Sequence, residues 1–496
     1  MQKIDQLTFT RFVAAIMVVV YHSGAGGADV LPFNLFPINR IVASSGFTAV
    51  TYFFVLSGFI MSYAYYRPDG RFRFSAYWQA RISRIYPVFI FSLLLTLWYY
   101  RDIFMKLLGP KLLANIFLVQ AWIPKWALSF NIPAWSLSVE MFFYFLFPFL
   151  AILATRLRPR TLIWISIVFW LISQIVHMML LTIYMPDEQF ILLYNPLFHL
   201  DSFLIGMAGG VWFLSQAPEL RISQKVNLGL LIGAAVFVIA LMMADAMKPG
   251  SLYFVDSGIF APLFLIMILA ISLDQTRLST LFRKPAFVLL GDASYSIYIL
   301  HIPVRWILEQ YVESHGTILS RPYFFYYAYF FITVGLSILA FKLIEAPSRT
   351  FLRDFFRRVF PLPPLFLWDL LVISISVVSS FILRLGPSAV IRKNIYLFLA
   401  ALAILIFVRT IAFAITRLYA KVDQPAILID IAKAVLWPVA LGTMLGAALW
   451  FVLYRGGLLD SFSRSILLME WFFSSILVFL VHYHNLKRKQ VTPSSA

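Results

Sequence analysis

The segment TFTRFVAAIMVVVYH, residues 8–22, places an arginine and a histidine at the two ends of an apolar run. Ten uncharged residues separate Arg11 from His22. Because an α-helix turns about 100° per residue, eleven steps return both side chains to within about 20° of one face, roughly 16 Å apart along the axis. The spacing predicts a membrane helix that binds an anionic group beside Arg11 and carries out proton chemistry at His22.

Two simpler interpretations of this helix compete with the catalytic one. Arg11 is also suited to anchoring a membrane helix, with His22 an ordinary interfacial residue. A signal peptide is the other alternative, since Lys3, the apolar run and the small residues 25–28 imitate its three regions. Asp5 and Arg11 fit that pattern poorly, and many further apolar segments follow. We therefore interpret the segment as the first membrane span.

The composition is that of an all-α polytopic membrane protein. The 496 residues are 61% hydrophobic and 12% charged, whereas soluble domains carry about 25% charged residues. The net charge of +18 lies in short basic loops between apolar segments, as the positive-inside rule predicts, so it does not indicate nucleic-acid binding. The sequence contains no cysteine, which excludes disulfides, thiolate nucleophiles and cysteine-ligated metals, and we predict no metal site.

Fourteen apolar segments divide the chain into two helical modules. Ten lie between residues 8 and 344, and four lie near 365–385, 395–415, 427–454 and 464–482. Arginines clustered within 67–84 and 349–358 predict which loops face the cytoplasm, and this pattern places both termini there. Prolines predict a cytoplasmic linker at 359–364, between a module at 1–358 and a module at 365–496.

Two regions are not expected to cross the membrane. Residues 29–41 are rich in proline and asparagine and read as an external loop. Residues 101–130 contain an apolar piece too short for a full crossing. Small residues at Gly46, Ser57 and Gly58 predict close helix contact along the second span.

Charged and titratable groups within the spans are candidate functional residues, because a charge in hydrocarbon costs roughly 3 kcal/mol on insertion scales. Those of the first module are Arg11, His22, Glu140, His177, His199, Asp201, Asp292, His301 and Glu345. His177 stands alone on an apolar face and is expected to be structural. The alternative for Asp201 and Asp292 is a structural role, in which they cap helix starts or pair with arginine.

Seven motifs follow one another along the first module. They are the helix from Arg11 to His22, FFVLSGF (53–59), RISRIYP (81–87), WSLSVE with FFYFLFP (135–148), FLIGM (203–207), GDASYSIYILHIP (291–303) and IEAP (344–347). In this order they resemble the membrane acyltransferase 3 family over about residues 4–355. The resemblance implies a bacterial inner-membrane enzyme that moves an acyl group, expected to be acetyl, from acyl-coenzyme A to a hydroxyl of a surface or lipid-linked polysaccharide sugar.

The resemblance also suggests roles for individual residues. Arg81 and Arg84 lie one turn apart at a cytoplasmic helix start, and with Arg11 they are expected to bind the phosphates of acyl-coenzyme A. The alternative for this pair is plain positive-inside charge. His22 is expected to take a proton from the acceptor hydroxyl, with Glu140 orienting or stabilising it if the two helices meet.

A second group of side chains is expected to line the path of the acyl group or the acceptor. Ser294, Tyr298 and His301 fall at i, i+4 and i+7 on one helical stripe. Ser136, in the WSLSVE motif, is assigned to the same path. The alternative for Ser294, Tyr298 and His301 is a structural role, in which they form hydrogen bonds between helices.

The last four spans resemble a different membrane domain. WDLLVISISVVSSFILRLG (368–386) and SFSRSILLMEWFFSSILVFLVHYHNLKRK (461–489) are similar to the four-span domain preceding the catalytic domain of polysaccharide-biosynthesis nucleotide-sugar dehydratases and epimerases. No Gly-rich dinucleotide fingerprint accompanies them, so that activity is not expected. Their charged residues are expected to pair with one another or to form a docking or lipid-linked-sugar site: Asp369, Arg384, Arg409, Asp430, Lys433 and Glu470.

Three functions remain open from the sequence. O-acyl transfer is the first, and a transporter or flippase for a polysaccharide intermediate is the alternative, although repeated halves with broken spans are not seen. The third makes the last four spans a scaffold for a polysaccharide-synthesis complex. The expected partners are acyl-coenzyme A as donor substrate, a carbohydrate or lipid-linked glycan acceptor and membrane lipids, without nucleic acid and without a permanently bound cofactor.

Overall fold

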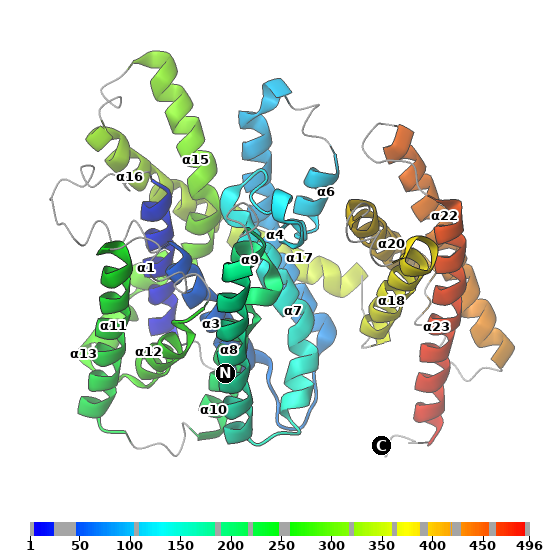
Figure 1. Ribbon diagram of the computed structural model, residues 1–496, viewed down its shortest axis with the longest axis horizontal. Coiled ribbons are helices and arrows are strands. Elements are labelled where there is room, and N and C mark those ends of the chain that lie inside the picture. Colours follow the sequence, from blue (N-terminus) through cyan, green and yellow to red (C-terminus); the bar gives the residue numbers. More distant parts are fainter. Residues whose placement is uncertain are drawn as a thin grey trace. The chain divides into compact units, whose positions relative to one another are not determined.

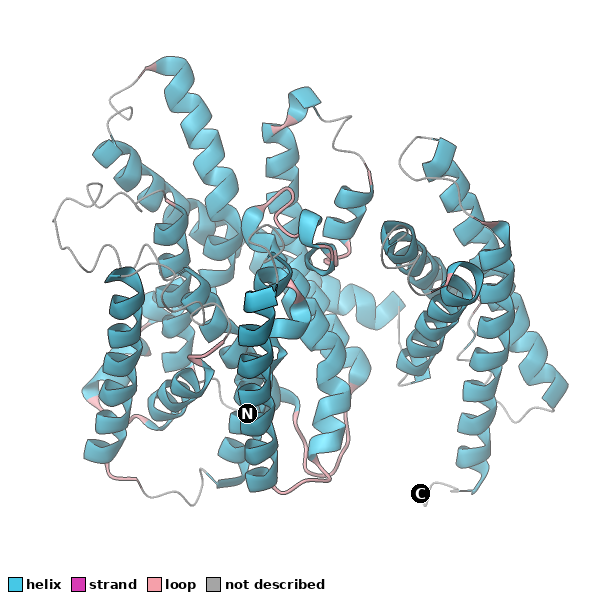
Figure 2. Cartoon of the chain, in the orientation of Figure 1, coloured by secondary structure: helices cyan, strands magenta, loops and turns pink. Residues whose placement is uncertain are grey.

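The computed structural model describes residues 4–23, 46–103, 109–183, 190–216, 222–247, 258–316, 322–359, 365–386, 395–416, 418, 428–455 and 463–491. Over these residues the regular secondary structure is helical, without a strand (Figure 2). The predicted all-α class is therefore confirmed. The expected external loop at 29–41 and residues 360–364 of the expected linker lie outside the described residues.

Ten described helices are long and apolar enough to cross a membrane. They are α3 (Gly46–Tyr65), α4 (Phe74–Tyr99), α7 (Trp135–Ala154), α8 (Pro159–Ile183), α10 (Leu200–Gln216), α11 (Gln224–Met247), α16 (Pro322–Ala340), α18 (Leu365–Leu385), α22 (Leu428–Arg455) and α23 (Arg464–Val491) (Figure 1). An eleventh span arises if α14 (Pro285–Asp292) and α15 (Ser294–His315), bent by 54°, count as one. The chain is thus a multi-pass membrane protein.

The other apolar segments predicted from the sequence are also helical. They form α1 (Asp5–His22), α12 (Ala261–Leu273) and α20 (Ile395–Ile415). The described part of residues 101–130 holds the short helix α6 (Pro110–Ile116) and 3-10 turns, none of them long enough to cross. The total of fourteen spans stays a prediction.

The chain divides into two compact units. The first comprises Met1–Phe72, Ala80–Arg101 and Leu118–Leu352, and the second comprises Arg73–Gln79, Asp102–Phe117 and Arg353–Ala496. The main division therefore falls between Leu352 and Arg353, a few residues before the predicted end of the first module. Two short upstream segments group with the second unit, which the apolar pattern of the sequence did not indicate.

Helices α3 and α10 pack closely along each other within the first unit. A Cβ atom on Gly58 would lie 2.2 Å from the carbonyl oxygen of Phe203, and one on Gly206 would lie 1.9 Å from that of Val55. Only glycine allows the two backbones this approach. In a membrane, where apolar burial does not separate protein from lipid, such backbone contact is a main source of helix association. The close contact predicted at Gly58 is confirmed.

Helix α1 is held by neighbours on three sides, α3, α14 and α15. A Cβ atom on Gly291 would lie 2.0 Å from the carbonyl oxygen of Thr8, so glycine lets α14 rest directly on α1. In α15, Pro303 has no N–H to donate to Ile299. The side-chain amide of Asn131 donates to that carbonyl instead, at 2.7 Å. The first contact fixes α14 on α1, and the second restores a hydrogen bond to the Ile299 carbonyl of α15, which also packs on α1.

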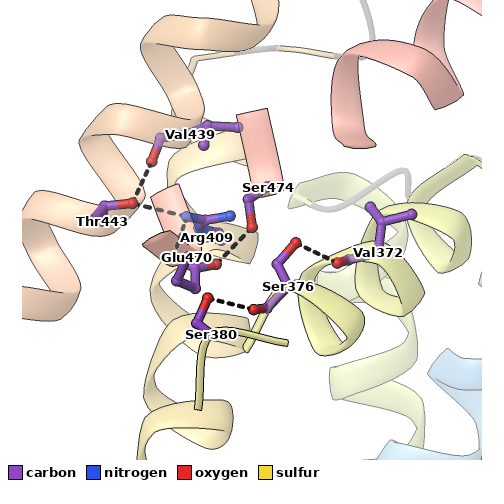
Figure 3. A network of polar contacts seen from close by, with 8 residues as sticks. All are labelled: Val372, Ser376, Ser380, Arg409, Val439, Thr443, Glu470 and Ser474. Carbon is purple, nitrogen blue, oxygen red and sulfur yellow. Dashed lines mark hydrogen bonds and ion pairs between the residues drawn. The ribbon is translucent and has the colours of Figure 1, made fainter. Parts of the chain in front are cut away.

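The second unit contains α18, α20, α22 and α23, with α18 packed on α23 and α20 packed on α22. A polar network crosses its interior (Figure 3). Arg409 donates to Glu470 at 2.7 Å and to Thr443 at 2.8 Å, and Ser474 donates to the other oxygen of Glu470 at 2.6 Å. The side chains of Arg409 and Glu470 are fully buried. A Cβ atom on Gly442 would lie 2.6 Å from Arg409 Cγ, so glycine makes room for the arginine stem.

The expected pairing among the charged residues of these spans holds in part. Arg409 and Glu470 form an ion pair, as predicted. Asp369 instead contacts His482, whose Nε2 atom lies 3.1 Å from its carboxylate, and both side chains are fully buried. Three of the expected participants are exposed: Arg384, Asp430 and Lys433. The sequence pattern did not single out His482.

Candidate functional site

A cavity of about 550 Å³ lies within the first unit. Residues of α1, α3, α4, α7, α14, α15 and α17 (Ala346–Val359) line it. Its charged lining, among the described residues, consists of five arginines and two carboxylates: Arg11, Arg67, Arg81, Arg84, Arg349, Glu140 and Asp292. Five positive charges against two negative ones leave a formal excess of three. The cavity is therefore suited to an anion.

Aromatic rings orient Arg81 within this cluster. Its guanidinium donates to the hydroxyl of Tyr65 at 3.0 Å. It also lies 5.2 Å from the ring centre of Tyr65 and 5.5 Å from that of Tyr144. Cation–π contact and a hydrogen bond both restrict the side chain. Arg84 follows one turn later on α4 and lines the same cavity.

Glu140 lies among the arginines. Tyr144 donates a hydrogen bond to its carboxylate at 3.1 Å, and Arg84 and Arg11 are close enough to attract it electrostatically. Ser136, Glu140 and Tyr144 are four residues apart on one face of α7, and all three line the cavity. The carboxylate thus balances part of the arginine charge.

His22 contacts another histidine. Its Nδ1 atom lies 3.2 Å from Nε2 of His301, and the two ring centres are 5.1 Å apart. Arg305, one turn further along α15, donates to the backbone carbonyl of His22. This joins the end of α1 to α15 through both a side chain and the backbone.

The structure does not bring Glu140 to His22. Among the described residues, no hydrogen bond joins the two side chains, and Glu140 lies instead at the level of Arg11. Since His22 is eleven residues further along α1, about 16 Å of helix separates it from that level. The side chain in contact with the His22 ring is His301, not the expected Glu140.

The remaining path residues lie between these two groups. The hydroxyls of Ser136 and Tyr298 are 2.7 Å apart, and the carbonyl of Pro133 accepts from this pair. Ser136, Tyr298 and Ser294 line the cavity. The carbonyl of Tyr298 in turn lies 2.7 Å from Nδ1 of His301. Tyr298 therefore connects the cavity wall to the histidine pair.

Arg349 was not predicted as a site residue, because in the sequence it belongs to a cytoplasmic run of arginines. A π-helical segment, Phe341–Glu345, precedes α17, and such segments often occur at functional sites. Glu345 at its end is fully buried, accepts from Ser296 at 2.6 Å and pairs with Arg349. This pair holds a fifth arginine at the cavity wall. The signal in the sequence was a carboxylate and an arginine at i and i+4 in IEAPSR.

A family profile described as "Acyltransferase domain" matches residues 4–342. The chain belongs to the acyltransferase 3 family. The match covers every charged cavity residue named above except Arg349, and it ends before Arg353, where the last and longest segment of the second unit begins. The resemblance of residues 365–496 to the membrane domain of nucleotide-sugar dehydratases stays a prediction.

Relatives within the acyltransferase 3 family come from Staphylococcus aureus. The chain is 25% identical to O-acetyltransferase OatA of strain NCTC 8325 / PS 47 over 369 residues, covering 68% of this chain and 56% of that protein. The values for OatA of strain COL are the same. The chain therefore spans a little over half the length of these relatives. No solved structure matches it.

Proposed function

We propose that this chain is a membrane O-acyltransferase that transfers an acetyl group from acyl-coenzyme A to a hydroxyl of a surface or lipid-linked polysaccharide sugar. The observation that carries the proposal is the arginine-lined cavity, with the His22–His301 pair beyond Tyr298. The names of the relatives support acetyl as the acyl group, because both are O-acetyltransferases.

The charge of the cavity supports a coenzyme A donor. The pyrophosphate and 3′-phosphate of coenzyme A carry about four negative charges, and arginine binds phosphate through paired hydrogen bonds. The cavity volume of about 550 Å³ lies within the usual range of ligand sites, about 300–1,000 Å³. Phosphates beside Arg11, Arg81, Arg84 and Arg349 would leave the pantetheine arm to reach along α1 toward His22, roughly 16 Å away.

The proposed chemistry is direct transfer. His22 accepts the proton of the acceptor hydroxyl as its oxygen attacks the thioester carbonyl. The carbon–sulfur bond then breaks, and the coenzyme A sulfur leaves with the proton held by His22. An ester and the free thiol are formed, and the imidazole returns to its starting state.

The same assignment orients the protein in the membrane. Four of the five cavity arginines lie in the basic clusters 67–84 and 349–358, which predict a cytoplasmic location: Arg67, Arg81, Arg84 and Arg349. Acyl-coenzyme A is a cytoplasmic metabolite, so a coenzyme A donor also supports a cytoplasmic location for this end of the cavity. We therefore propose a bacterial inner-membrane protein with both termini cytoplasmic.

The direct test is transfer by the purified full-length protein in lipid nanodiscs. Acetyl-coenzyme A labelled in the acetyl group should transfer label to a lipid-linked glycan, with release of free coenzyme A thiol. Mass spectrometry of the surface polysaccharide from cells with and without the protein should show a matching loss of acetyl esters. Two results together would overturn the proposal. The purified protein would bind acetyl-coenzyme A but label no glycan, and cells without the protein would keep the acetyl esters of their surface polysaccharide.

Replacing Arg84 or Arg81 with alanine should weaken acetyl-coenzyme A binding. Each change removes a charge-assisted contact of about 1.5–3 kcal/mol, which is roughly tenfold to a hundredfold in dissociation constant. Titration calorimetry with the purified variants measures the effect. Arg71→Ala is the matched control, because its side chain is 89% exposed and lies outside the cavity lining. Equal affinity of the native protein and the three variants for acetyl-coenzyme A would mean that Arg81 and Arg84 serve only to orient the protein in the membrane.

A further inference from the structure

We propose that His301 is the positioning residue of the reaction: it accepts the Nδ1–H of His22 and so keeps the Nε2 lone pair of His22 for the acceptor hydroxyl. This inference rests on the proposed transfer reaction. It assigns a defined role to a residue that the sequence placed only on the path of the acyl group or the acceptor. Hydrogen-bond geometry on both rings supports it.

The protonation of His301 follows from its neighbours. Its Nδ1 atom lies 2.7 Å from the carbonyl oxygen of Tyr298. A carbonyl can only accept, so Nδ1 carries the hydrogen. The ring is fully buried, and a neutral imidazole avoids the cost of an ion there. In the neutral ring Nε2 is then bare, which makes it an acceptor facing His22.

The tautomer of His22 follows in the same way. Its Nδ1 atom lies 3.1 Å from the carbonyl oxygen of Val18 and 3.2 Å from Nε2 of His301. Both of these atoms accept, so a hydrogen on His22 Nδ1 satisfies both contacts. The other tautomer would point the Nδ1 lone pair at two acceptors. With Nδ1 protonated, a neutral His22 has its free lone pair on Nε2.

The position of the ring is fixed together with its tautomer. Arg305 follows His301 by one turn and donates to the backbone carbonyl of His22, and Glu309 accepts from Arg305 at 2.7 Å. One face of α15 therefore holds both the ring and the backbone at the end of α1. A base must lie within hydrogen-bond reach of its proton, and small misplacements lower the rate strongly.

A neutral orienting residue suits a membrane interior. In soluble enzymes a carboxylate often orients the catalytic base. A buried carboxylate without its full set of partners is costly, and more so in hydrocarbon. His301 orients the base without carrying a charge. When His22 gains a proton on Nε2, the Nδ1–H of His22 remains hydrogen-bonded to His301 and to the carbonyl of Val18. The structure thus uses Glu140 to balance arginines and His301 to orient the base.

The kinetic test compares two substitutions of His301 in the full-length protein. His301→Leu removes the acceptor, so kcat for acetyl transfer should fall by about 10²-fold while KM for acetyl-coenzyme A changes less than about twofold. His301→Gln places an amide oxygen near the position of Nε2 and should recover kcat to within about tenfold of the native value. His177→Leu is the control, since His177 is also buried but neither ring nitrogen has a hydrogen-bond partner among the described residues.

Solid-state ¹⁵N NMR of histidine-labelled protein gives a readout that needs no turnover. The difference between native protein and His22→Gln isolates the His22 signals, which should report the Nδ1–H tautomer in native protein and a mixture in His301→Leu. Equal loss of kcat in the Leu and Gln variants, an effect on KM alone, or an Nε2–H tautomer in native His22 would each overturn the proposal. If native protein transfers no acetyl group but shows the expected tautomers, the proposed reaction fails and the histidine geometry stands.

Discussion

His22→Ala should abolish acetyl transfer while the protein stays folded in the membrane. Removing a general base typically lowers a rate by about 10² to 10⁴. The hydrogen bond from Arg305 goes to the backbone carbonyl of residue 22, so it survives the substitution. The ring also lies outside the described lining of the cavity, so the affinity for acetyl-coenzyme A should be unchanged. The expected signature is a fall in kcat without a change in dissociation constant.

The measurement is the initial rate of labelled acetyl transfer, with the thermal unfolding midpoint and the gel-filtration profile checked on the same sample. His315→Ala is a suitable control, because His315 ends α15 and is exposed. A His22→Ala protein that transfers acetyl at the native rate would remove the central catalytic assignment. A protein that unfolds would show that His22 stabilises the contact between α1 and α15, and His22→Gln would then be the variant to assay.

Glu470→Leu should have the largest effect on the stability of the second unit. The substitution leaves the fully buried guanidinium of Arg409 without its counter-charge. Breaking a buried ion pair from one side typically costs about 3–5 kcal/mol, whereas replacing both partners with apolar residues is often nearly neutral. The double variant Arg409→Met/Glu470→Leu should therefore recover most of the lost stability.

The stability of the second unit is measured by unfolding the purified protein in mixed micelles. Limited proteolysis within residues 365–496 monitors the extent of unfolding in each variant. Arg384→Met is the matched control, because it removes an arginine that is exposed near the end of α18. Additive losses in the double variant would contradict the ion-pair assignment. Because the cavity is lined by residues of the first unit, we expect acetyl transfer per folded molecule to be the same in all four proteins.

Much of the candidate site was predictable from local spacing. Arg81 and Arg84 lie one turn apart, and Ser136 and Glu140 also lie one turn apart, so each pair shares a helix face wherever its helix packs. All four line the cavity together with Arg11. A polar face on a membrane helix must turn away from lipid, since charge in hydrocarbon is costly. The sequence therefore indicated which faces point inward.

Partnerships between helices were not predictable in the same way. His22 and His301 are 279 residues apart in the chain, and Glu140 was expected beside His22 instead. These partnerships depend on how far each helix is shifted along its neighbour. Close backbone contacts at glycine, such as that of Gly291 with Thr8, set this shift. Arg349 was missed for a related reason, because its use depends on the buried Glu345 at the end of a π-helical segment.

The helical, multi-pass architecture could be predicted from the apolar segments alone, because every backbone polar group in lipid must be satisfied within its own helix, and the apolar lengths follow from that requirement. The inward faces that carry Arg11, Arg81 and Glu140 could be predicted in the same way. That Glu140 lies with the arginines and His301 contacts His22 became evident only from the packing of the helices. The depth of one helix against another is set by backbone contact between distant segments, and no local period in the chain encodes that depth.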